Sequence, residues 1–256
     1  MKKGIPEIET RIEKIRRVEL DTVKPWFRPG MRVLEIGGGN GFQAKLLSSW
    51  GCQVDSLDVQ NRPNWPVTYF EVKTYDGVNI PFSAQSFDMI FSSNVLEHVL
   101  PDNLQALLQE TRRVMKPRTA ISIHILPTPS WRFWNNLAHY PYLVKYLSGY
   151  GKTAMMPTIP TRDQALKENT IFSLVQRAIL PRPHGEYPSA LSELYFFSQR
   201  RWVREFGEAG LACESTMNTN IFYTGYGLSR KLHLPTRCWL SRILGNSTRG
   251  YILRAT

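Results

Sequence analysis

Nine residues at positions 33–41 place an acid directly before a glycine-rich turn. The stretch reads Val-Leu-Glu-Ile-Gly-Gly-Gly-Asn-Gly, so an apolar run containing Glu35 leads into Gly37, Gly38, Gly39 and Gly41. Glycine lets the backbone turn tightly and lets a ligand approach the main chain without meeting a Cβ. The helix expected just after the turn adds unsatisfied N–H groups at its start. Such a turn can hold a ligand against the main chain.

A second acid, Asp58, lies in a short strand expected over residues 53–59, next to Val59. In nucleotide-binding folds, an acid about 20 residues beyond a glycine loop holds the hydroxyls of a ribose. A carboxylate suits this role because it offers two acceptor oxygens to two hydroxyl donors. The alternative is an ordinary polar residue at a strand end, and the position of Asp58 favours the ribose.

The nearest competing pattern is the dinucleotide fingerprint Gly-x-Gly-x-x-Gly. Counted from Gly37 and Gly39, it requires a glycine or alanine where this chain has Phe42. Phenylalanine is too large for the close helix–strand packing that the third glycine permits. A glycine-rich turn without any ligand is the other alternative that stays open.

The spacing Glu-x-Gly-x-Gly-x-Gly resembles the cofactor loop of class I S-adenosylmethionine-dependent methyltransferases, in particular those of the type 11-like family. Two later motifs carry the same resemblance in the family's order. Asp76-Gly77 precedes the triplet Ile80-Pro81-Phe82, and a further run reads Ser93-Asn94-Val95-Leu96-Glu97-His98-Val99. The resemblance covers roughly residues 31–126.

This resemblance implies S-adenosylmethionine as the cofactor and S-adenosylhomocysteine as the product. In the family, Asp76 would contact the adenine amine and Asn94 would lie under the methionine part. The residues implied at the cofactor are Glu35, Gly37, Gly38, Gly39, Gly41, Asp58, Val59, Asp76, Gly77 and Asn94. Taken alone, Asp-Gly is also a plain turn, and Asn94 also fits a polar cap of the turn that follows.

Strand and helix patterns alternate over residues 31–126, which predicts crossover units and a parallel sheet. After the first strand, strands are expected over residues 53–59, 67–72, 87–93 and 120–126, with helices over 43–50 and 102–116. A helix over 198–209 and strands over 211–223 and 249–253 then follow. We expect a Rossmann-like, seven-stranded, mostly parallel sheet with helices on both faces, and the resemblance implies an antiparallel last strand. Glu35, Asp58, Asp76 and Asn94 fall at or near strand ends, where ligands bind.

The chain is expected to form one methyltransferase domain with an inserted segment between strands five and six. Residues 1–30 would form a helical flank with a helix over 7–23, residues 31–126 the cofactor-binding core, and 193–256 the rest of the sheet. Residues 127–192 hold eight of the 17 prolines, are rich in aromatics, and are too long for a plain loop. We interpret them as a substrate cap with short helices over 130–137 and 174–179. Packing of an oversized loop is the alternative.

Three histidines are candidates for a catalytic base, which a hydroxyl acceptor would require. His98 follows the fourth strand, where related enzymes place residues near the methyl group, and His184 lies in the insert close to Glu186. Each could instead have a packing or turn role. His124 lies inside a strand, where a core histidine is favoured. Glu193 and Tyr195 are further residues that could line the cavity.

The C-terminal part of the chain is basic. Residues 215–256 contain six Lys or Arg and no Asp or Glu, within a net charge of +11. The segment 228–244 combines basic and apolar residues, which suggests peripheral contact with an anionic membrane. A solvated basic face is an equal alternative, and nucleic acid is unlikely because no RNA-binding module is recognisable.

Composition indicates a globular chain with 42% hydrophobic and 21% charged residues. The start lacks the apolar region of a secretory signal, and no run is long enough to span a bilayer. Three widely spaced cysteines form no metal-like pair, so no bound metal is expected. The same cysteine usage predicts a protein of the reducing cytoplasm. The basic segment over residues 228–244 suggests, as an alternative localisation, peripheral association with the inner face of the membrane.

We therefore expect an S-adenosylmethionine-dependent methyltransferase. A faint resemblance of residues 184–202 to methyltransferases of cell-surface sugars and specialised metabolites implies an oxygen of a small-molecule or glycan-like acceptor. The alternatives are a quinone or lipid methyltransferase at a membrane surface, a non-catalytic methyltransferase-like partner protein, and a nicotinamide-dependent oxidoreductase.

Overall fold

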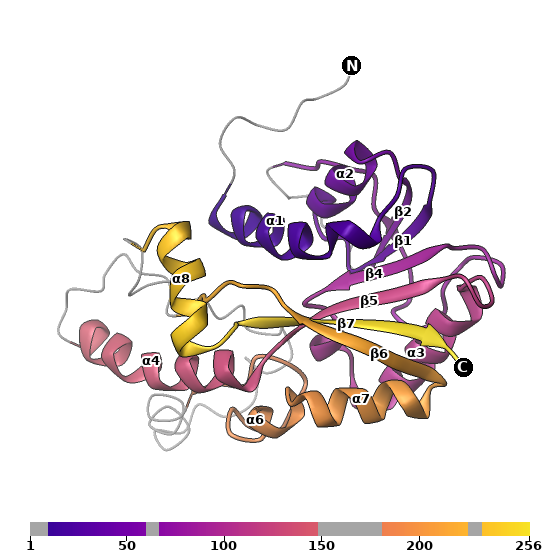
Figure 1. The fold of residues 1–256 in the computed structure, drawn as a ribbon. Helices are drawn as coiled ribbons and strands as arrows, with labels where there is room; N and C mark the ends of the chain where they lie inside the picture. The colour runs from indigo at the N-terminus through magenta and orange to yellow at the C-terminus, as the bar shows by residue number, and fades with distance from the viewer. Residues whose placement is uncertain (1–9, 60–66, 148–180, 225–231) are drawn as a thin grey trace.

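The computed structural model contains one mixed sheet between two layers of helices (Figure 1). It describes residues 10–59, 67–147, 181–224 and 232–256. The seven strands lie in the order β3-β2-β1-β4-β5-β7-β6. Their bounds are β1 Arg32–Ile36, β2 Gln53–Asp58, β3 Lys73–Thr74, β4 Met89–Ser93, β5 Ile121–Pro127, β6 Leu211–Asn218 and β7 Thr248–Ala255.

Strand direction matches the expected fold class. β1 pairs in parallel with β2 and β4, and the β2–β3 and β4–β5 pairs are parallel too. β7 lies between β5 and β6 and is antiparallel to both. The Rossmann-like, mostly parallel sheet with an antiparallel last strand is therefore confirmed. The carboxyl ends of β1, β2 and β4 consequently meet at one edge.

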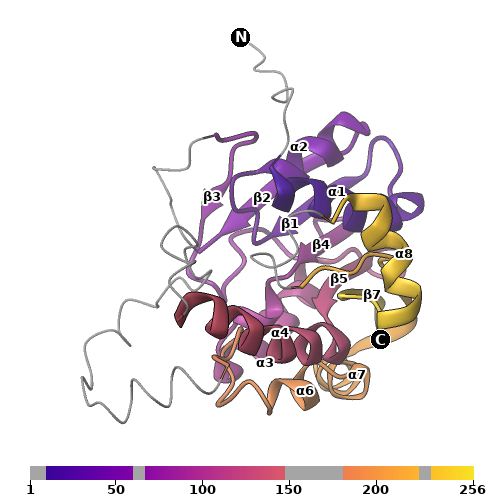
Figure 2. The ribbon, with the colours of Figure 1, turned by 90° about the vertical axis from the view of Figure 1, so that its left-hand side faces the viewer.

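Helices cover both faces of the sheet (Figure 1). α1 (Arg11–Val23) and α2 (Phe42–Ser49) lie on one face, and α3 (Pro101–Val114) and α7 (Gln199–Glu208) lie on the other. Two short 3-10 helices, η1 (Lys24–Trp26) and η2 (Leu96–His98), follow α1 and β4. The described part of the chain also contains α4 (Pro129–Leu147), α6 (Glu193–Phe196) and α8 (Leu234–Leu244). Figure 2 shows α4 and α8 beside the ends of β5 and β7.

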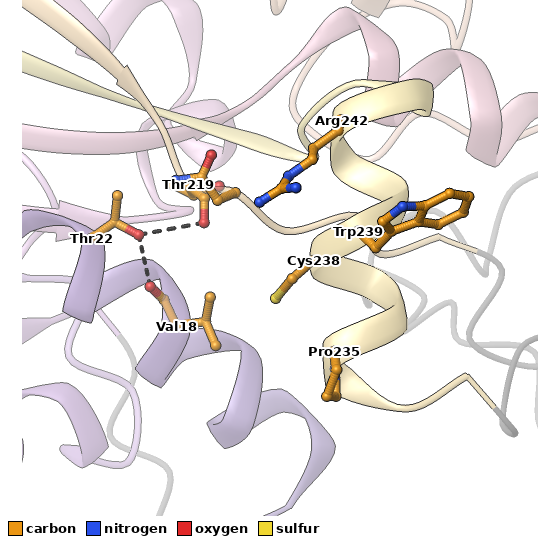
Figure 3. Close-up of a pocket in the computed structure, with 8 residues that line it drawn as sticks. Val18, Thr22, Thr219, Pro235, Cys238, Trp239 and Arg242 are labelled. Atoms are coloured by element: carbon orange, nitrogen blue, oxygen red, sulfur yellow. Dashed lines mark hydrogen bonds between the residues drawn. The ribbon is translucent and has the colours of Figure 1, made fainter.

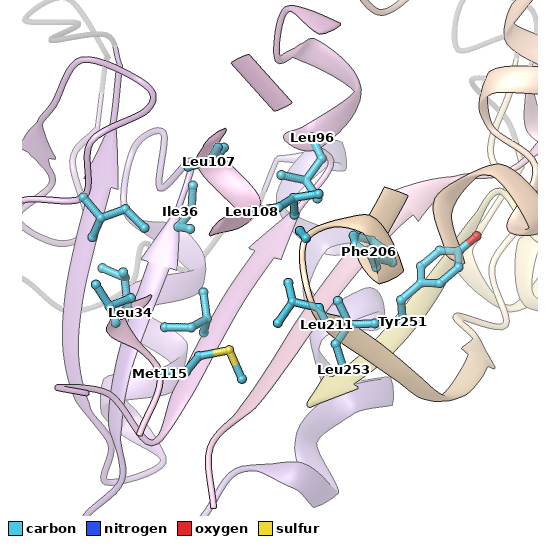
Figure 4. Packing of buried hydrophobic residues seen from close by; sticks show 14 of the residues in the cluster. Leu34, Ile36, Leu96, Leu107, Leu108, Met115, Phe206, Leu211, Tyr251 and Leu253 are labelled. Carbon is cyan, nitrogen blue, oxygen red and sulfur yellow. The ribbon is translucent and has the colours of Figure 1, made fainter. Parts of the chain in front are cut away.

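Alternation along the central strands produces two apolar layers. Met89 and Phe91 of β4 pack with α1 and α2, whereas Ile90 packs with α3 and α7. Figure 4 shows the second layer, where Leu107 and Leu108 of α3 meet Phe206 of α7 over the sheet. A parallel sheet buried on both faces requires this apolar content on both sides of each strand.

The strand expected over residues 67–72 is wrong, and the structure has only the two-residue β3 that follows it. Residues 67–72 pack on the glycine turn instead. The Tyr69 N–H donates to the Asn40 carbonyl over 2.8 Å, and the Tyr69 ring contacts Phe42 edge-on. The β-branched and aromatic residues that suggested a strand are used in this contact.

Other boundaries differ more modestly. The helix expected over 130–137 is part of the longer α4, and the one expected over 174–179 lies outside the described residues. α1 begins at Arg11 because Thr10 and Glu13 form a capping box. β6 ends at Asn218, before the left-handed residue Asn220. Among the described residues, no helix has both the length and the apolarity to cross a bilayer.

A buried carboxylate, Glu19, joins α1 to the sheet. Its side chain has no exposed surface and accepts hydrogen bonds from Thr248 Oγ1 at 2.7 Å and Tyr223 Oη at 3.0 Å. Arg16 Nη1 donates to its other oxygen over 2.6 Å, and Asn94 Nδ2 over 3.4 Å. Glu19 therefore connects α1, the end of β4, the start of β7 and the segment after β6.

Glu19→Ala should destabilise the fold by about 3–5 kcal/mol, because it removes the buried acceptor that the Thr248 and Tyr223 hydroxyls share. The free energy of unfolding in urea measures this loss. Glu208→Ala on α7 is the control, since that side chain is 56% exposed and pairs only with Arg204 across 3.7 Å. It should change stability by less than about 0.5 kcal/mol. Equal losses in both variants would contradict a special role for Glu19.

Candidate functional site

The glycine turn between β1 and α2 is fixed by bonds to the end of β2. The N–H groups of Gly37 and Gly38 donate to the Leu57 carbonyl over 2.7 and 2.9 Å. The Gly39 N–H donates to the Asp58 carboxylate over 2.8 Å. Gly37, Gly39 and Gly41 all have positive φ, between 56° and 78°. The turn and Asp58 therefore form one unit at the carboxyl edge.

Two of the glycines are required by the protein's own packing. A Cβ at Gly38 would lie 2.0 Å from Ser56 Oγ and 2.8 Å from Glu35 Oε2. A Cβ at Gly37 would lie 2.2 Å from Val95 Cγ2. The turn thus passes directly over the side chains that follow β4 and line β2, and any larger residue would move it.

Glu35 lies beneath this turn. It is 2% exposed, and Ser56 Oγ donates to it over 2.5 Å. Burial raises the pKa of Glu35 to about 7, and the nearby Asp58 charge adds to the rise, while the Ser56 hydrogen bond opposes it. The structure therefore places Glu35 as an internal support of the turn, with Asp58 half-buried above it.

Asp76 and Gly77 form a turn beside the end of β2. The exposed Asp76 carboxylate accepts bonds from the N–H groups of Val78 and Asn79 at 2.8 and 2.7 Å and from the Asn79 amide, and these bonds lower its pKa. A Cβ at Gly77 would approach Val59 Cγ1 to 2.9 Å. The two acid-bearing segments thus lie side by side, although Asp76 also has the bonding of a plain turn.

Asn94 completes this edge immediately after β4. It has a left-handed φ of 56°, and its Nδ2 donates to Ser93 Oγ at 3.1 Å and to Glu19. Tyr223 Oη donates to Asn94 Oδ1 over 3.3 Å. The amide is therefore oriented by α1 and by the segment after β6. Sequence reasoning missed Glu19, although an acid on the apolar Ile15–Val23 face of a helix was a usable signal.

Two of the three candidate histidines lie together. The rings of His98, in η2, and His184, in the insert, have centroids 4.7 Å apart, and Trp131 of α4 lies 4.7 Å from His184 on its other side. Desolvation lowers the pKa of both rings. The Glu97 carboxylate adjoins them, with Oε1 at 3.9 Å from His98 Nε2. Glu97 has no exposed surface, and its burial raises its pKa to about 8.

Glu193 holds the His184 loop from behind. The N–H groups of His184 and Gly185 both donate to Glu193 Oε1 over 2.6 Å, and Arg132 Nε lies 3.1 Å from Glu193 Oε2. Glu193 is buried, so it supports the loop and does not line an open cavity. Glu186, the acid that lies close to His184 in the sequence, instead donates its N–H to the Glu97 carbonyl over 3.1 Å. Tyr195 is 53% exposed.

His124 is separate from the other two histidines. Its Nδ1 hydrogen bonds with Ser92 Oγ and its Nε2 with Ser122 Oγ, both at 2.7 Å, and the ring stacks on Phe206. The side chain has no exposed surface, and burial lowers its pKa to about 3. With both nitrogens bonded inside the α7 layer, His124 has the arrangement of a core histidine.

A hollow of about 530 Å³ lies between α1 and α8 (Figure 3). It contains none of the residues predicted for the cofactor or the base. Its lining residues are Val18, Thr22, Thr219, Asn220, Pro235, Cys238, Trp239 and Arg242. The Thr22 hydroxyl donates to the Val18 and Thr219 carbonyls there, so α1 is bonded to the floor of the hollow.

The sheet order and the glycine turn after its first strand define a Rossmann-like α/β protein, a fold in which ligands bind at the carboxyl edge of the sheet. The family profile described as "Methyltransferase domain" matches residues 9–216. The chain belongs to this methyltransferase family. The expected class I S-adenosylmethionine-dependent methyltransferase is thereby confirmed, with S-adenosylmethionine as the cofactor.

Curated relatives agree over part of their length. An uncharacterized methyltransferase of Synechocystis is 31% identical over 118 residues, which are 43% of this chain and 54% of that protein. A demethylmenaquinone methyltransferase of Beutenbergia cavernae is 30% identical over 143 residues, 54% of this chain and 57% of that protein. The chain thus spans little more than half the length of these relatives.

Solved structures support the fold. An S-adenosylmethionine-dependent methyltransferase from Archaeoglobus fulgidus has a TM-score of 0.52 at 17% identity, covering 94% of this chain and 93% of that one. One from Mesorhizobium loti has a TM-score of 0.51 at 12% identity, covering 93% and 97%. At such identities the likeness concerns the fold alone.

The burial of His124 makes stability depend on pH. Its pKa is about 3 in the folded chain and about 6.5 in the unfolded one, so its contribution is complete above pH 6.5 and falls as pH decreases towards 3. Between pH 7 and pH 5, wild type should lose about 2 kcal/mol relative to His124→Gln. Unfolding free energies across this range measure the difference. The exposed His233 provides the control, and His233→Gln should follow wild type. Parallel curves for wild type and His124→Gln would contradict this account.

Proposed function

We propose that the protein transfers the methyl group of S-adenosylmethionine to an oxygen of a small-molecule or glycan-like acceptor. The observation that supports this best is the unit made by the Gly37–Gly39 main chain and Asp58, next to the Asp76 turn. Carboxylates suit the ribose hydroxyls and the adenine amine, and the turn admits a ligand to its main chain. The residues present therefore fit the cofactor.

The roles follow the strand ends. Asp58 would accept bonds from the ribose, Asp76 with Gly77 and Val59 would meet the adenine, and Asn94 would lie under the methionine part. The turn can pass close to β2 and to the residues after β4 because it is built from Gly37, Gly38, Gly39 and Gly41. Glu35 supports the turn from beneath. When bound, the cofactor supplies an electrophilic methyl group on a positively charged sulfur.

The protein contributes alignment and proton removal. Holding two reactants in line can account for roughly 7–11 kcal/mol of a barrier. A base for a hydroxyl acceptor adds about 10²–10⁴-fold in rate. His98 and His184 are the candidates that lie together, and His98 belongs to η2, which follows Asn94 in the chain. We propose that this pair contacts the acceptor, whereas His124 has a structural role in the core.

The insert would cap the acceptor. Its described residues bring Trp131 and His184 to η2, beside His98. An aromatic ring next to two imidazoles suits the face of a sugar or of an aromatic metabolite. The division of the single domain into a flank, a core, a cap and a C-terminal part is consistent with this arrangement, with the cap in residues 127–192.

Asp58→Asn should weaken binding of S-adenosylhomocysteine about 10- to 100-fold, because a hydrogen bond to a charged acceptor contributes about 1.5–3 kcal/mol. Asparagine still accepts from the Gly39 N–H, so the turn is preserved. Isothermal titration calorimetry measures the affinity. Asp55→Asn, on the same strand and paired with Arg32 and Lys73, is the matched control and should bind normally. Absence of binding to wild type would overturn the proposed function, and equal loss in both variants would remove Asp58 from the site.

A lipid quinone at a membrane surface is a second candidate acceptor. The exposed face of α8 carries Trp239 at 56% exposure and Ile243 at 64%, next to Arg242. Such a face suits insertion into an anionic interface, and the relative from Beutenbergia cavernae is a demethylmenaquinone methyltransferase. A cytoplasmic protein could contact the inner membrane face in this way. A scaffold role without catalysis is the remaining candidate, and formation of S-adenosylhomocysteine in a cell extract would reject it.

Sedimentation with anionic vesicles separates the membrane candidate from a soluble acceptor. If α8 contacts lipid, the protein should pellet with vesicles at low salt and less so at high salt, because Arg242 acts electrostatically. Ile243→Ala should reduce the pelleted fraction severalfold. Val203→Ala, at a 37% exposed site on α7, is the control and should not. Failure of the wild-type protein to pellet would reject the membrane candidate.

A further inference from the structure

Three potential metal ligands converge where the insert meets η2. Glu97 and His98 come from η2, and His184 comes from the loop that Glu193 holds. One carboxylate oxygen of Glu97 and one ring nitrogen of each histidine all lie within 4.8 Å of one another. His184 is distant in sequence from the adjacent Glu97 and His98, yet the three ligand atoms share one small volume.

The Glu97 carboxylate has no hydrogen-bond partner for either oxygen within the described chain, although the side chain is fully buried. A buried, unpaired carboxylate costs several kcal/mol, so native structures rarely leave one without compensation. Neither His98 nor His184 has a ring hydrogen bond among the described residues. Three groups with lone pairs therefore face one another, and none is bonded to another.

The backbone on both sides is fixed in this position. The Glu186 N–H donates to the Glu97 carbonyl over 3.1 Å, and Gly185 passes so close that a Cβ would lie 2.2 Å from the same oxygen. Glu193 holds the N–H groups of His184 and Gly185 from the other side. The Glu97 carbonyl and the Glu193 carboxylate therefore both hold the His184 loop against η2.

We propose that Glu97, His98 and His184 bind a divalent transition-metal ion. Two imidazoles and a carboxylate are the ligand set of many zinc and non-haem iron sites, which keep further positions open for water or substrate. Metal–ligand bonds of about 2.0–2.2 Å need ligand atoms closer together than they are here, so the side chains must contract slightly around the ion.

A proton on Glu97 is the competing solution. It would neutralise the carboxylate, but the hydroxyl so formed would need an acceptor, and His98 Nε2 at 3.9 Å is beyond hydrogen-bond reach. A cation instead satisfies all three groups together. A protonated Glu97 without a bound ion is the alternative outcome of the zinc titration.

The existence of the metal site does not depend on the proposed function, but the role given to the ion here does. As metal ligands, His98 and His184 would no longer act as bases; a hydroxyl bound to the ion at an open position would instead lose its proton to solvent more readily. Its oxygen would then form the O–CH₃ bond while the S–CH₃ bond breaks and the sulfur keeps the electron pair. The acceptor class this implies is a hydroxyl-bearing molecule that can also coordinate a metal.

Calorimetric titration of Zn²⁺ alone into the chelator-treated full chain tests the site, without any methyl donor. We expect one ion per chain with micromolar or tighter affinity. Glu97→Gln, His98→Ala and His184→Ala should each weaken binding at least tenfold. His233→Ala, which removes an exposed histidine at the start of α8, should leave it unchanged. Binding of S-adenosylhomocysteine to each variant shows that it is folded.

Absence of Zn²⁺ binding overturns the site and leaves a protonated Glu97. Binding that persists in all three variants, or that His233→Ala also removes, overturns it too, because the ion is then held elsewhere. Failure of the chain to bind S-adenosylhomocysteine while Zn²⁺ still binds would instead reject the proposed function and keep the metal site. The zinc titration therefore tests the metal site, and the S-adenosylhomocysteine titration independently tests the proposed function.

Discussion

The Glu19 carboxylate is the interaction on which the arrangement of the carboxyl edge depends. It is buried on α1, yet it accepts bonds from Tyr223, which follows β6, and from Thr248, which begins β7 at the same end of the β6–β7 pair. The same carboxylate contacts the amide of Asn94. Because Asn94 adopts a left-handed conformation after β4, it needs such anchoring to hold one orientation. Fold stability and the geometry of the site thus share one residue.

Charge is distributed very unevenly between this edge and the rest of the chain. The net charge is +11, which would repel a cationic sulfonium. Five acids lie at or near the carboxyl edge, namely Glu19, Glu35, Asp58, Asp76 and Glu97. They differ in burial: raised pKa values mark Glu35 and Glu97 as internal groups, whereas Asp58 is half-buried and Asp76 is exposed. In the proposed function, the Asp58 and Asp76 carboxylates could therefore attract the cationic cofactor within a basic protein.

Sequence reasoning reached the sheet because its strands and helices alternate clearly, and it reached Asp58 because a glycine turn fixes where the next strand ends. It failed at residues 67–72, where Tyr69 packs on Phe42 in a contact that no local pattern reveals. It also listed Glu97 only as part of a motif. The meeting of Glu97 with His184 depends on the absence of a Cβ at Gly185, which only the folded chain makes visible. Local periodicity predicts elements, whereas contacts between distant loops need the structure.

The same contact at Gly185 makes the insert and the sheet edge mechanically one unit. η2 is a single turn that directly follows Asn94, and its Glu97 carbonyl receives the main chain of the insert. A shift of the loop at 184–186 must therefore move η2 or break this bond, and a shift of η2 reaches Asn94 within three residues. In the proposed function, one short segment would therefore set both the cofactor and the acceptor positions. In-line transfer demands such shared positioning, because the donor methyl and the acceptor atom must be aligned together.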